Sequence, residues 1–407
     1  MNKKTATATV MSKPRAGKKI QTARDLAING APPAFNRILH VGSPNIGSVE
    51  GFLQYVGQVF DCRRLTNNGP LVQEFEQRVA DYHGVRHCVA MCNGTIALEI
   101  AIRALGLEGE VIVPSYTFIA TAHALYWQGI TPVFADIDAA THNLDPESVR
   151  RMITPRTTGI IGVHLWGRSA PVEALQAIAD EHGLKLMFDA AHAFGCSRKS
   201  QMIGNFGDCE VLSFHATKFF NTFEGGAVVT NNEMLAETMR LMRNFGFAGL
   251  DTVIHPGTNG KMMELAAAMG LVNLDAIDDM IDANRCNYQA YREALDGLSG
   301  VRVLPFDESE RNNYQYVVVE VEAGGTVSRD RMIDALHAEN IRARKYFWPG
   351  CHNMQPYRDL YPSAEKMLPK TRQVADRVVV LPTGTALDHA SVADVAAVIR
   401  VLMTSDT

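Results

Sequence analysis

The nine residues LKLMFDAAH, Leu184–His192, carry the clearest structural signal in the chain. They contain a short, mostly apolar run, Leu184–Phe188, that follows a glycine and ends in the carboxylate of Asp189. Runs of this length and composition are typical of buried strands, and an open α/β sheet binds its ligands at the carboxyl ends of such strands. We therefore expect Asp189 to lie at a ligand-binding edge, while a cap or turn role for its side chain is an open alternative.

Six further apolar runs share this pattern and alternate with segments of helical length. The runs are His87–Met91, Val111–Pro114, Pro132–Ala135, Gly159–Leu165, Val211–Phe214 and Ala227–Thr230. Segments such as Ile96–Leu107 and Pro171–His182 are long enough to form right-handed crossovers between parallel strands. The sequence therefore predicts an α/β fold whose large domain contains a mostly parallel, seven-stranded sheet.

The pattern changes after a long helical stretch from Met262 to about Leu298, which we expect to be broken at most once. Beyond it the sequence predicts a strand over 314–321, a helix over 329–340, strands over 341–347 and 378–381, and a helix over 392–403. Together these elements indicate a smaller α+β domain. We place the boundary near Arg285, so that residues 31–284 form the large domain with an N-terminal arm and residues 285–407 form the small domain.

Residues 1–30 are expected to form a disordered basic tail. The first 24 residues contain no acid and are otherwise mostly small and polar. Their basic residues are Lys3, Lys4, Lys13, Arg15, Lys18, Lys19 and Arg24. A transit peptide is the alternative, but the segment lacks the amphipathic period of such peptides.

The composition excludes several functional classes. Of the 407 residues, 46% are hydrophobic, and 39 Lys and Arg against 44 Asp and Glu give a net charge of -5, so we expect a folded protein without a nucleic-acid partner. No apolar run approaches the roughly 18 residues of a membrane span, and the first residues lack the apolar centre of a secretory signal. The seven cysteines fit neither a disulfide framework nor a zinc motif. We expect a cytoplasmic protein with no metal site and no membrane association.

A candidate anion site follows the first predicted strand, at Asn93-Gly94-Thr95. Gly94 lets a ligand approach the backbone closely, and Thr95 adds a hydroxyl at the start of the next predicted helix. The N-terminus of a helix presents unpaired N–H groups and a positive dipole end to an anion. An ordinary turn with a helix cap explains the same three residues and stays open.

A candidate reactive lysine follows another predicted strand, in the segment Ser213–Lys218 that precedes Glu224-Gly225-Gly226. A free lysine with a pKa near 10.4 is unprotonated only about once in ~2500 molecules at pH 7. Burial, or storage of the amine as an imine, removes this deficit and makes Lys218 a competent nucleophile. A surface lysine is the alternative.

An anion site, an aspartate at a strand end and a lysine that can form an imine are together what pyridoxal phosphate requires. The anion site would hold the phosphate, Asp189 would keep the pyridine nitrogen protonated, and Lys218 would hold the aldehyde carbon. The segment Pro114–Phe118 supplies aromatic side chains that could stack on the ring, with core packing as the alternative. For His192 two interpretations stay open, a histidine packed in the core and a residue that contacts the ligand.

These residues resemble the DegT-type, pyridoxal-phosphate-dependent sugar aminotransferases, a family of the fold type I aminotransferase class. The resemblance runs from about Leu65 to Leu387. Its motifs are Asn93-Gly94-Thr95, Pro114–Phe118, Asp189–His192, Ser213–Lys218 with Glu224-Gly225-Gly226, and Gly257–Met262. It implies a fold type I architecture and an aminotransferase that works with pyridoxal 5′-phosphate.

The resemblance also assigns roles to individual residues. It implies that Lys218 forms the imine and that Asp189 pairs with the pyridine nitrogen. The remaining cofactor-binding residues that it implies are Gly94, Thr95 and Ser213 around the phosphate and Phe118 and His192 beside the ring. Asn259 matches the position that reaches the phosphate from the other subunit, so the resemblance implies a homodimer with shared active sites.

Within this family the resemblance is to the enzymes that aminate dTDP-4-keto-6-deoxyglucose in desosamine and viosamine biosynthesis. It extends to Val163–Arg168 and Tyr346–His352, outside the cofactor motifs. It implies transfer of an amino group from L-glutamate to C4 of the keto sugar nucleotide, and Lys218 favours amino transfer because dehydratase relatives carry histidine there. Two alternatives are amination of a 3-keto sugar nucleotide or cyclitol ketone and, in another class, a non-catalytic pyridoxal-phosphate-binding regulator.

Three residues of the C-terminal part are candidate substrate contacts. Arg344 could reach the substrate diphosphate together with Arg342 and Lys345, because alternate residues of a strand point the same way. An exposed strand edge explains these basic residues equally well. The same two interpretations, a substrate contact and a structural role, stay open for Tyr346 and His352.

Overall fold

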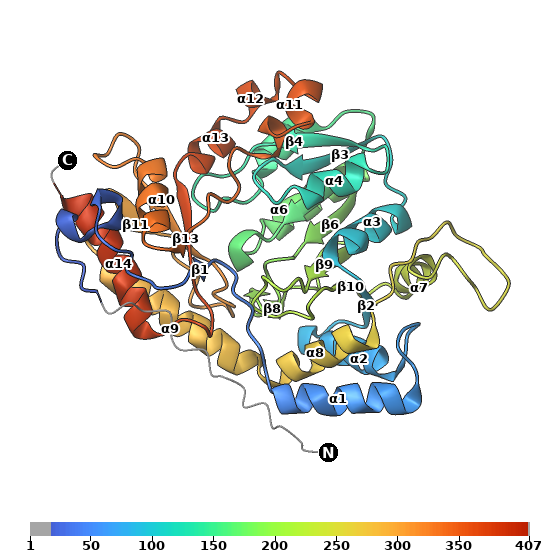
Figure 1. Ribbon diagram of the computed structural model, residues 1–407. Helices are drawn as coiled ribbons and strands as arrows, with labels where there is room; N and C mark the ends of the chain where they lie inside the picture. The colour runs from blue at the N-terminus through green and yellow to red at the C-terminus, as the bar shows by residue number, and fades with distance from the viewer. Residues whose placement is uncertain (1–17, 406–407) are drawn as a thin grey trace, which may run out of the picture.

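The structure is a computed structural model that describes residues 18–405, and its centre is a seven-stranded sheet (Figure 1). In sheet order its strands are β2 (His87–Met91), β10 (Gly226–Thr230), β9 (Cys209–Ser213), β6 (Lys185–Asp189), β5 (Thr157–Val163), β3 (Glu110–Pro114) and β4 (Thr131–Ala135). Only β10 among these strands runs antiparallel to its neighbours. The predicted mostly parallel, seven-stranded sheet is confirmed, and each strand overlaps one of the seven predicted runs.

Helices cover both faces of this sheet, as alternation of side chains along each strand requires. Met187 of β6 packs in the apolar cluster that includes helices α3 (Gly94–Ala104), α4 (Ala120–Tyr126) and α7 (Glu233–Met242). Its neighbours Leu186 and Phe188 pack in the opposite cluster, with α5 (Pro146–Met152) and α6 (Val172–His182). The carboxyl ends of the parallel strands therefore share one edge between two helical layers.

Four further helices lie below the sheet in the view of Figure 1, three of them near β2 and the fourth running on to the C-terminal part. They are α1 (Val49–Cys62), α2 (Pro70–His83), α8 (Glu264–Asp275) and α9 (Ile277–Leu295). Helices α8 and α9 meet at Ala276, which confirms the prediction of a long helical stretch with one break. Residue 285 lies inside α9, so the boundary that we placed there falls within a continuous helix, and the division into 31–284 and 285–407 stays a prediction.

The C-terminal part contains a small antiparallel sheet of β11 (Val301–Val303), β12 (Val317–Val321) and β14 (Val378–Leu381). It packs with α9, α10 (Arg329–Ala338) and α14 (His389–Thr404). The remaining elements are β7 (Ser197–Arg198), β8 (Gln201–Met202), α11 (Tyr357–Leu360), α12 (Ala364–Met367) and α13 (Pro369–Ala375), with 3₁₀ turns at Ala23–Asp25, Ala27–Asn29, Leu165–Gly167 and Cys351–Asn353.

The strand predicted over 341–347 is wrong beyond its first two residues. Only β13 (Ile341–Arg342) is a strand, and it pairs in parallel with β1 (Leu39–His40) of the N-terminal arm. The chain then turns, because Trp348 N–H donates to the carbonyl of Lys345 at 2.7 Å and Gly350 N–H donates to that of Phe347 at 2.7 Å. This turn directs the segment toward the carboxyl edge of the large sheet.

Part of the predicted tail is also ordered. Residues 1–17 lie outside the described residues, but residues 18–30, which we assigned to the tail, pack on α10 and the residue that follows it. Leu26 is buried, and the buried carboxylate of Glu339 accepts N–H bonds from Ala27 at 2.6 Å and Ala34 at 2.7 Å. The prediction failed here because Glu339 lies more than 300 residues away in the sequence.

Across residues 18–405, no helix combines the length and the apolar character needed to cross a membrane.

Candidate active site

A cavity of about 590 Å³ opens at the carboxyl edge of the large sheet and is called the main cavity below. Its wall brings together predicted residues from five separate segments of the chain. They are Gly94, Thr95, Phe118, Asp189, His192, Ser213, Lys218 and Tyr346. The topology explains the convergence, because β6 ends at Asp189, β9 ends at Ser213 and α3 begins at Gly94 on this one edge.

The first turn of α3 forms one end of the main cavity. Asn93 caps the helix through its side-chain oxygen, which accepts the Ile96 N–H at 2.8 Å. The N–H groups of Gly94 and Thr95 precede the first intrahelical bond, from Ala97 N–H to the Asn93 carbonyl at 3.1 Å, so they are free to bind a ligand. The hydroxyl groups of Thr95 and Ser213 line the same end. This donor set suits a phosphate group.

Close packing of the backbone makes this end of the cavity possible. A Cβ atom on Gly94 would lie 3.0 Å from Cβ of Ser213. A Cβ atom on Gly226, the first residue of β10, would lie 2.6 Å from the backbone carbon of Asn93. Side chains at these two positions would push α3 away from β9 and β10, so both glycines hold the donors in place.

Asp189 lies buried at the base of the main cavity. Its Oδ2 accepts a hydrogen bond from Thr121 Oγ1 at 2.8 Å, and its Oδ1 accepts the Ala191 N–H at 3.1 Å. Burial raises the pKa of Asp189, and these two hydrogen bonds together with nearby Lys218 oppose the rise. Because each carboxylate oxygen can accept a further bond, Asp189 is suited to hold a protonated ring nitrogen.

Lys218 projects from the turn after β9, where its N–H donates to the His215 carbonyl at 2.8 Å. Burial lowers the pKa of Lys218 to about 8, although the charge of Asp189 acts in the opposite direction. A substantial fraction of this amine is therefore neutral near pH 8, as a nucleophile or base requires. The structure places Lys218 in the main cavity and not on the surface.

Aromatic rings form the wall beside His192. The Nδ1 atom of His192 accepts the Trp166 N–H at 3.4 Å, and its ring centre lies 4.6 Å from that of Tyr316. Its plane is within 16° of that of Phe347 at 5.8 Å between centres. Burial lowers the pKa of His192 well below its usual range, and the charge of Lys218 lowers it further, so this imidazole is neutral.

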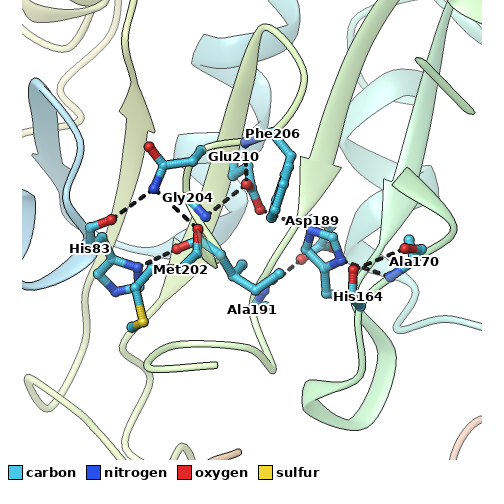
Figure 2. A network of polar contacts seen from close by, with 12 residues as sticks. His83, His164, Ala170, Asp189, Ala191, Met202, Gly204, Phe206 and Glu210 are labelled. Atoms are coloured by element: carbon cyan, nitrogen blue, oxygen red, sulfur yellow. Dashed lines mark hydrogen bonds and ion pairs between the residues drawn. The ribbon is translucent and has the colours of Figure 1, made fainter. Parts of the chain in front are cut away.

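A second layer of buried polar groups lies behind Asp189 (Figure 2). The N–H of His164 donates to the Asp189 carbonyl at 3.0 Å, and its Nδ1 accepts the Ala170 N–H at 2.9 Å. The ring proton is therefore on Nε2, which donates to Glu210 Oε2 at 2.9 Å. The other oxygen of Glu210 accepts the N–H groups of Gly204 at 2.7 Å and Phe206 at 2.8 Å. Glu210 and His164 are fully buried.

Sequence reasoning missed several of these residues. Thr121 lies inside α4 and carries no local motif, and Tyr316 and Phe347 reach the cavity from segments that are distant in the sequence. His164 and Glu210 were not selected either, although each lies at or beside a predicted buried strand. A charged residue within such a strand, as Glu210 is, was the one available signal.

Three predicted residues lie outside the main cavity. Asn259 is exposed, and the segment that carries it bridges to Asn244. His352 is 1% exposed, and its Nδ1 lies 2.6 Å from the hydroxyl of Ser115, with which it shares a hydrogen bond. Arg344 lies beside the main cavity, with its guanidinium carbon 4.6 Å from the centre of the Tyr346 ring.

Comparison with known proteins identifies similar chains. The DegT/DnrJ/EryC1/StrS aminotransferase family matches residues 48–400. The chain is 37% identical over 360 residues to a dTDP-4-amino-4,6-dideoxy-D-glucose transaminase of Escherichia coli, covering 87% of this chain and 96% of the relative. It is 35% identical over 327 residues to a GDP-perosamine synthase of Caulobacter vibrioides, covering 79% and 87%.

A solved structure shares the whole architecture. DesI, crystallised in the presence of its TDP-sugar product, superposes with a TM-score of 0.88 at 49% identity, covering 94% of this chain and 97% of the DesI chain. The architecture predicted from the sequence, that of the fold type I aminotransferases, is confirmed.

Proposed function

Since the chain belongs to the DegT/DnrJ/EryC1/StrS aminotransferase family, we propose that it transfers an amino group from L-glutamate to C4 of dTDP-4-keto-6-deoxy-D-glucose. The cofactor in this proposal is pyridoxal 5′-phosphate. The observation that carries it is the convergence of Lys218, Asp189 and the first amides of α3 on one cavity.

The substrate assignment is supported by the similar proteins. The Escherichia coli relative is named for a dTDP sugar with its amino group at C4, and DesI was crystallised with a TDP-sugar product. The Caulobacter vibrioides relative is named for a GDP sugar, so family membership alone leaves the nucleotide open. The higher identity to the first two proteins favours the thymidine nucleotide.

The residues of the main cavity fit the proposed cofactor. The amides of Gly94 and Thr95 with the Ser213 hydroxyl would hold its phosphate, Asp189 would hold its protonated ring nitrogen, and Lys218 would hold its aldehyde carbon. His192 and Phe118 line the same space and would flank the ring. When bound, pyridoxal phosphate supplies an electron sink for the electron pair that is left when a substrate carbon loses a proton.

Lys218 then has a second task in the proposed reaction. Its amine removes a proton from the carbon that carries the amino group and later returns a proton as an acid. A pKa of about 8 suits both directions, because the amine is neither fully protonated nor fully neutral near physiological pH. Neutral His192 beside it adds no competing charge.

Asp189 supports this chemistry by its charge. A buried carboxylate needs a cationic partner, and a protonated ring nitrogen supplies one. The contacts from Thr121 and Ala191 fix the orientation of the carboxylate, and each of its oxygens keeps a lone pair for a further donor. The ion pair keeps the ring positive and so favours uptake of electrons.

We also propose that the protein works as a homodimer with shared active sites. Asn259 does not line the main cavity of its own chain and is exposed. It is therefore available to reach the phosphate end of a partner's cavity, the role that the family resemblance implies.

The proposed function is tested by incubating the cofactor-loaded protein with L-glutamate and dTDP-4-keto-6-deoxyglucose, and reading the product by mass spectrometry and NMR. The expected product carries the new amino group at C4, and borohydride trapping is expected to label Lys218. Amination at C3 of the 3-keto isomer alone would overturn the regiochemistry. Labelling of a different lysine would overturn the site.

A further inference from the structure

A series of polar contacts runs from the small antiparallel sheet to the wall of the main cavity. Oε1 of Glu320, a residue of β12, lies 2.6 Å from Nε2 of His142. The other ring nitrogen of His142, Nδ1, accepts the indole N–H of Trp166 at 3.2 Å. The backbone N–H of Trp166 donates in turn to Nδ1 of His192 at 3.4 Å. These four residues, called the polar chain below, connect a carboxylate of the C-terminal part with the cavity wall.

The donors in the polar chain fix the tautomer of both histidines. An indole N–H and a backbone N–H can only donate, so Nδ1 is unprotonated in His142 and in His192. The ring proton of each histidine is therefore on Nε2. In His142 this proton is donated to the carboxylate of Glu320. In His192, which lines the main cavity, it is the one polar hydrogen that the side chain can offer to a ligand.

Trp166 is held in a conformation that its own backbone does not favour. Its φ of 63° and ψ of 13° lie in the left-handed region, which is uncommon for a residue with a bulky side chain. Such a conformation persists where the surrounding contacts determine it. Here the indole is bonded to His142 and the backbone N–H to His192. Loss of the His142 acceptor would therefore remove one of the contacts that hold this turn.

The ring of Trp166 also orders the aromatic wall of the main cavity. It lies within 20° of parallel to the His192 ring at 6.0 Å between centres, and within 14° of parallel to the Phe347 ring at 5.2 Å. Tyr316 meets it at 70° and 5.3 Å. Both arrangements are favourable for aromatic pairs. These three neighbours line the main cavity, whereas Trp166 is fully buried and acts on the cavity only through them.

The outer end of the polar chain reaches the protein surface. Oε2 of Glu320 accepts hydrogen bonds from Arg302, at 2.6 Å from Nη2 and 3.2 Å from Nε. The side chain of Arg302 is 54% exposed, that of Glu320 is 15% exposed and that of His142 is fully buried. The charge of Glu320 is therefore balanced by a guanidinium outside, while a histidine proton binds it inside. The ion pair with Arg302 can be removed without breaking the inner hydrogen bond.

We propose that Glu320, His142 and Trp166 are positioning residues that keep His192 in its Nε2–H form and parallel to the ring of Phe347. This inference rests on the proposed function, because it takes the occupant of the main cavity to be pyridoxal phosphate, beside whose ring His192 would lie. It gives a carboxylate of the small sheet an influence on cofactor binding, although the carboxylate contacts neither cofactor nor substrate.

The first measurement follows the hydrogen bond of Trp166 itself. The sequence contains three tryptophans, so labelling with ¹⁵N-tryptophan gives three indole signals in NMR spectra, and W127F and W348F assign the signal of Trp166 by elimination. We expect its indole proton to exchange with deuterated water most slowly of the three. In His142→Phe, which keeps a ring but removes the acceptor, this exchange should be at least about tenfold faster.

The second measurement reads the tautomer of His192. The protein is labelled with ¹⁵N-histidine, and His192→Gln assigns the signals of His192. In the unmodified protein we expect a protonated Nε2 and an unprotonated Nδ1. In H142F the released turn of Trp166 no longer donates to Nδ1, so His192 should exchange between its two neutral forms.

The third measurement is the affinity of the cofactor-free protein for pyridoxal phosphate, obtained by absorbance titration. We expect H142F and Glu320→Leu to weaken binding about two- to tenfold, the range that one hydrogen bond contributes. Glu320→Gln should recover most of the affinity, because its amide oxygen still accepts the proton of His142. Arg302→Gln is the matched control and should bind as the unmodified protein does, because it removes only the exposed ion pair.

A purely structural role of the polar chain gives a different result. If H142F and E320L unfold at lower denaturant concentration, yet His192 keeps its Nε2–H form and the cofactor binds as tightly as before, the positioning role is wrong. Should H142F fail to fold, E320L decides against E320Q and R302Q, because position 320 lies nearer the surface. Equal affinity in these three variants would overturn the proposal.

Failure of the positioning role and failure of the proposed function are distinguishable. If L-glutamate converts the bound cofactor to its aminated form but H142F and E320L leave both the tautomer of His192 and the cofactor affinity unchanged, the positioning role is overturned and the aminotransferase stands. If both variants release the tautomer and weaken cofactor binding but L-glutamate never aminates the cofactor, the positioning role is supported and the proposed function fails.

Discussion

The hydroxyl of Thr121 donates a hydrogen bond of 2.8 Å to Oδ2 of Asp189, and both residues are buried. Sequence inspection pointed to the acid but not to its donor. The contact lowers the pKa of a carboxyl group whose pKa burial raises, so the charge on Asp189, at the end of β6, depends on a threonine of α4. This dependence can be measured.

We expect Thr121→Val to weaken cofactor binding by roughly 1–3 kcal/mol, the usual cost of leaving a buried acceptor without its donor. The pKa of Asp189 should rise, so the acid limb of the pH profile for amino transfer should move to higher pH. Cofactor titration and the pH profile measure the two effects. Thr230→Val is the control, because Thr230 is equally buried and bonds the Asp208 carbonyl at 2.7 Å, far from the main cavity. Equal cofactor affinity in both variants would contradict the prediction.

The lowered pKa of Lys218 predicts a pH dependence for cofactor uptake. Only the neutral amine attacks an aldehyde, so the rate at which the cofactor-free protein binds pyridoxal phosphate should rise with pH through about 8 and then level off. An ordinary lysine would give a rate that rises until about pH 10.4. Stopped-flow absorbance distinguishes the two profiles, and a continued rise above pH 9 would show that Lys218 is not perturbed.

The close packing at the start of α3 predicts that Gly94→Ala selectively weakens cofactor binding. The new Cβ would lie 3.0 Å from Cβ of Ser213 and would separate the donors of α3 from β9. Cofactor affinity should fall at least about tenfold, since hydrogen bonds to charged groups contribute roughly 1.5–3 kcal/mol each. Gly57→Ala is the control, because Gly57 of α1 has open space around its Cα and alanine favours a helix. Affinity is read by fluorescence titration, and an unchanged affinity in Gly94→Ala would rule out this phosphate site.

The buried Glu210 and His164 predict an effect on stability. His164 Nε2 donates to Glu210, whose other oxygen accepts two N–H groups. In Glu210→Gln the side-chain NH₂ group takes the place of one acceptor oxygen. It then faces a buried N–H donor, and both are left without an acceptor. The free energy of unfolding should therefore fall by about 1–3 kcal/mol. Glu173→Gln weakens the exposed ion pairs with Arg198 and Lys199 and should cost about 1 kcal/mol or less. Denaturant unfolding compares the two variants, and a smaller loss for Glu210→Gln would contradict this role.

The large sheet could be predicted from the sequence because each of its strands is a short apolar run bounded by polar residues. Asp189 and Lys218 were found for the same reason, since each follows such a run, whereas Ser213 lies within a run and was assigned by the family resemblance. The turn after β13 was not predictable, because Arg344 to Phe347 look like a strand and their course depends on bonds to distant segments. Thr121 and Tyr316 act only through tertiary contacts, so no pattern of neighbouring residues marks them.

The proposed sharing of active sites predicts complementation between two inactive variants. Lys218→Ala lacks the reactive amine, and Asn259→Ala lacks the side chain that we expect a partner to receive. In a hybrid dimer one of the two sites combines Lys218 from one chain with Asn259 from the other and is complete, whereas the second site lacks both. Random pairing makes about half of the dimers hybrid, so the mixture should recover about a quarter of the unmodified activity. Activity is assayed after joint refolding, with each variant refolded alone as the control. A mixture no more active than the mean of the two variants alone would show that Asn259 serves its own chain or neither.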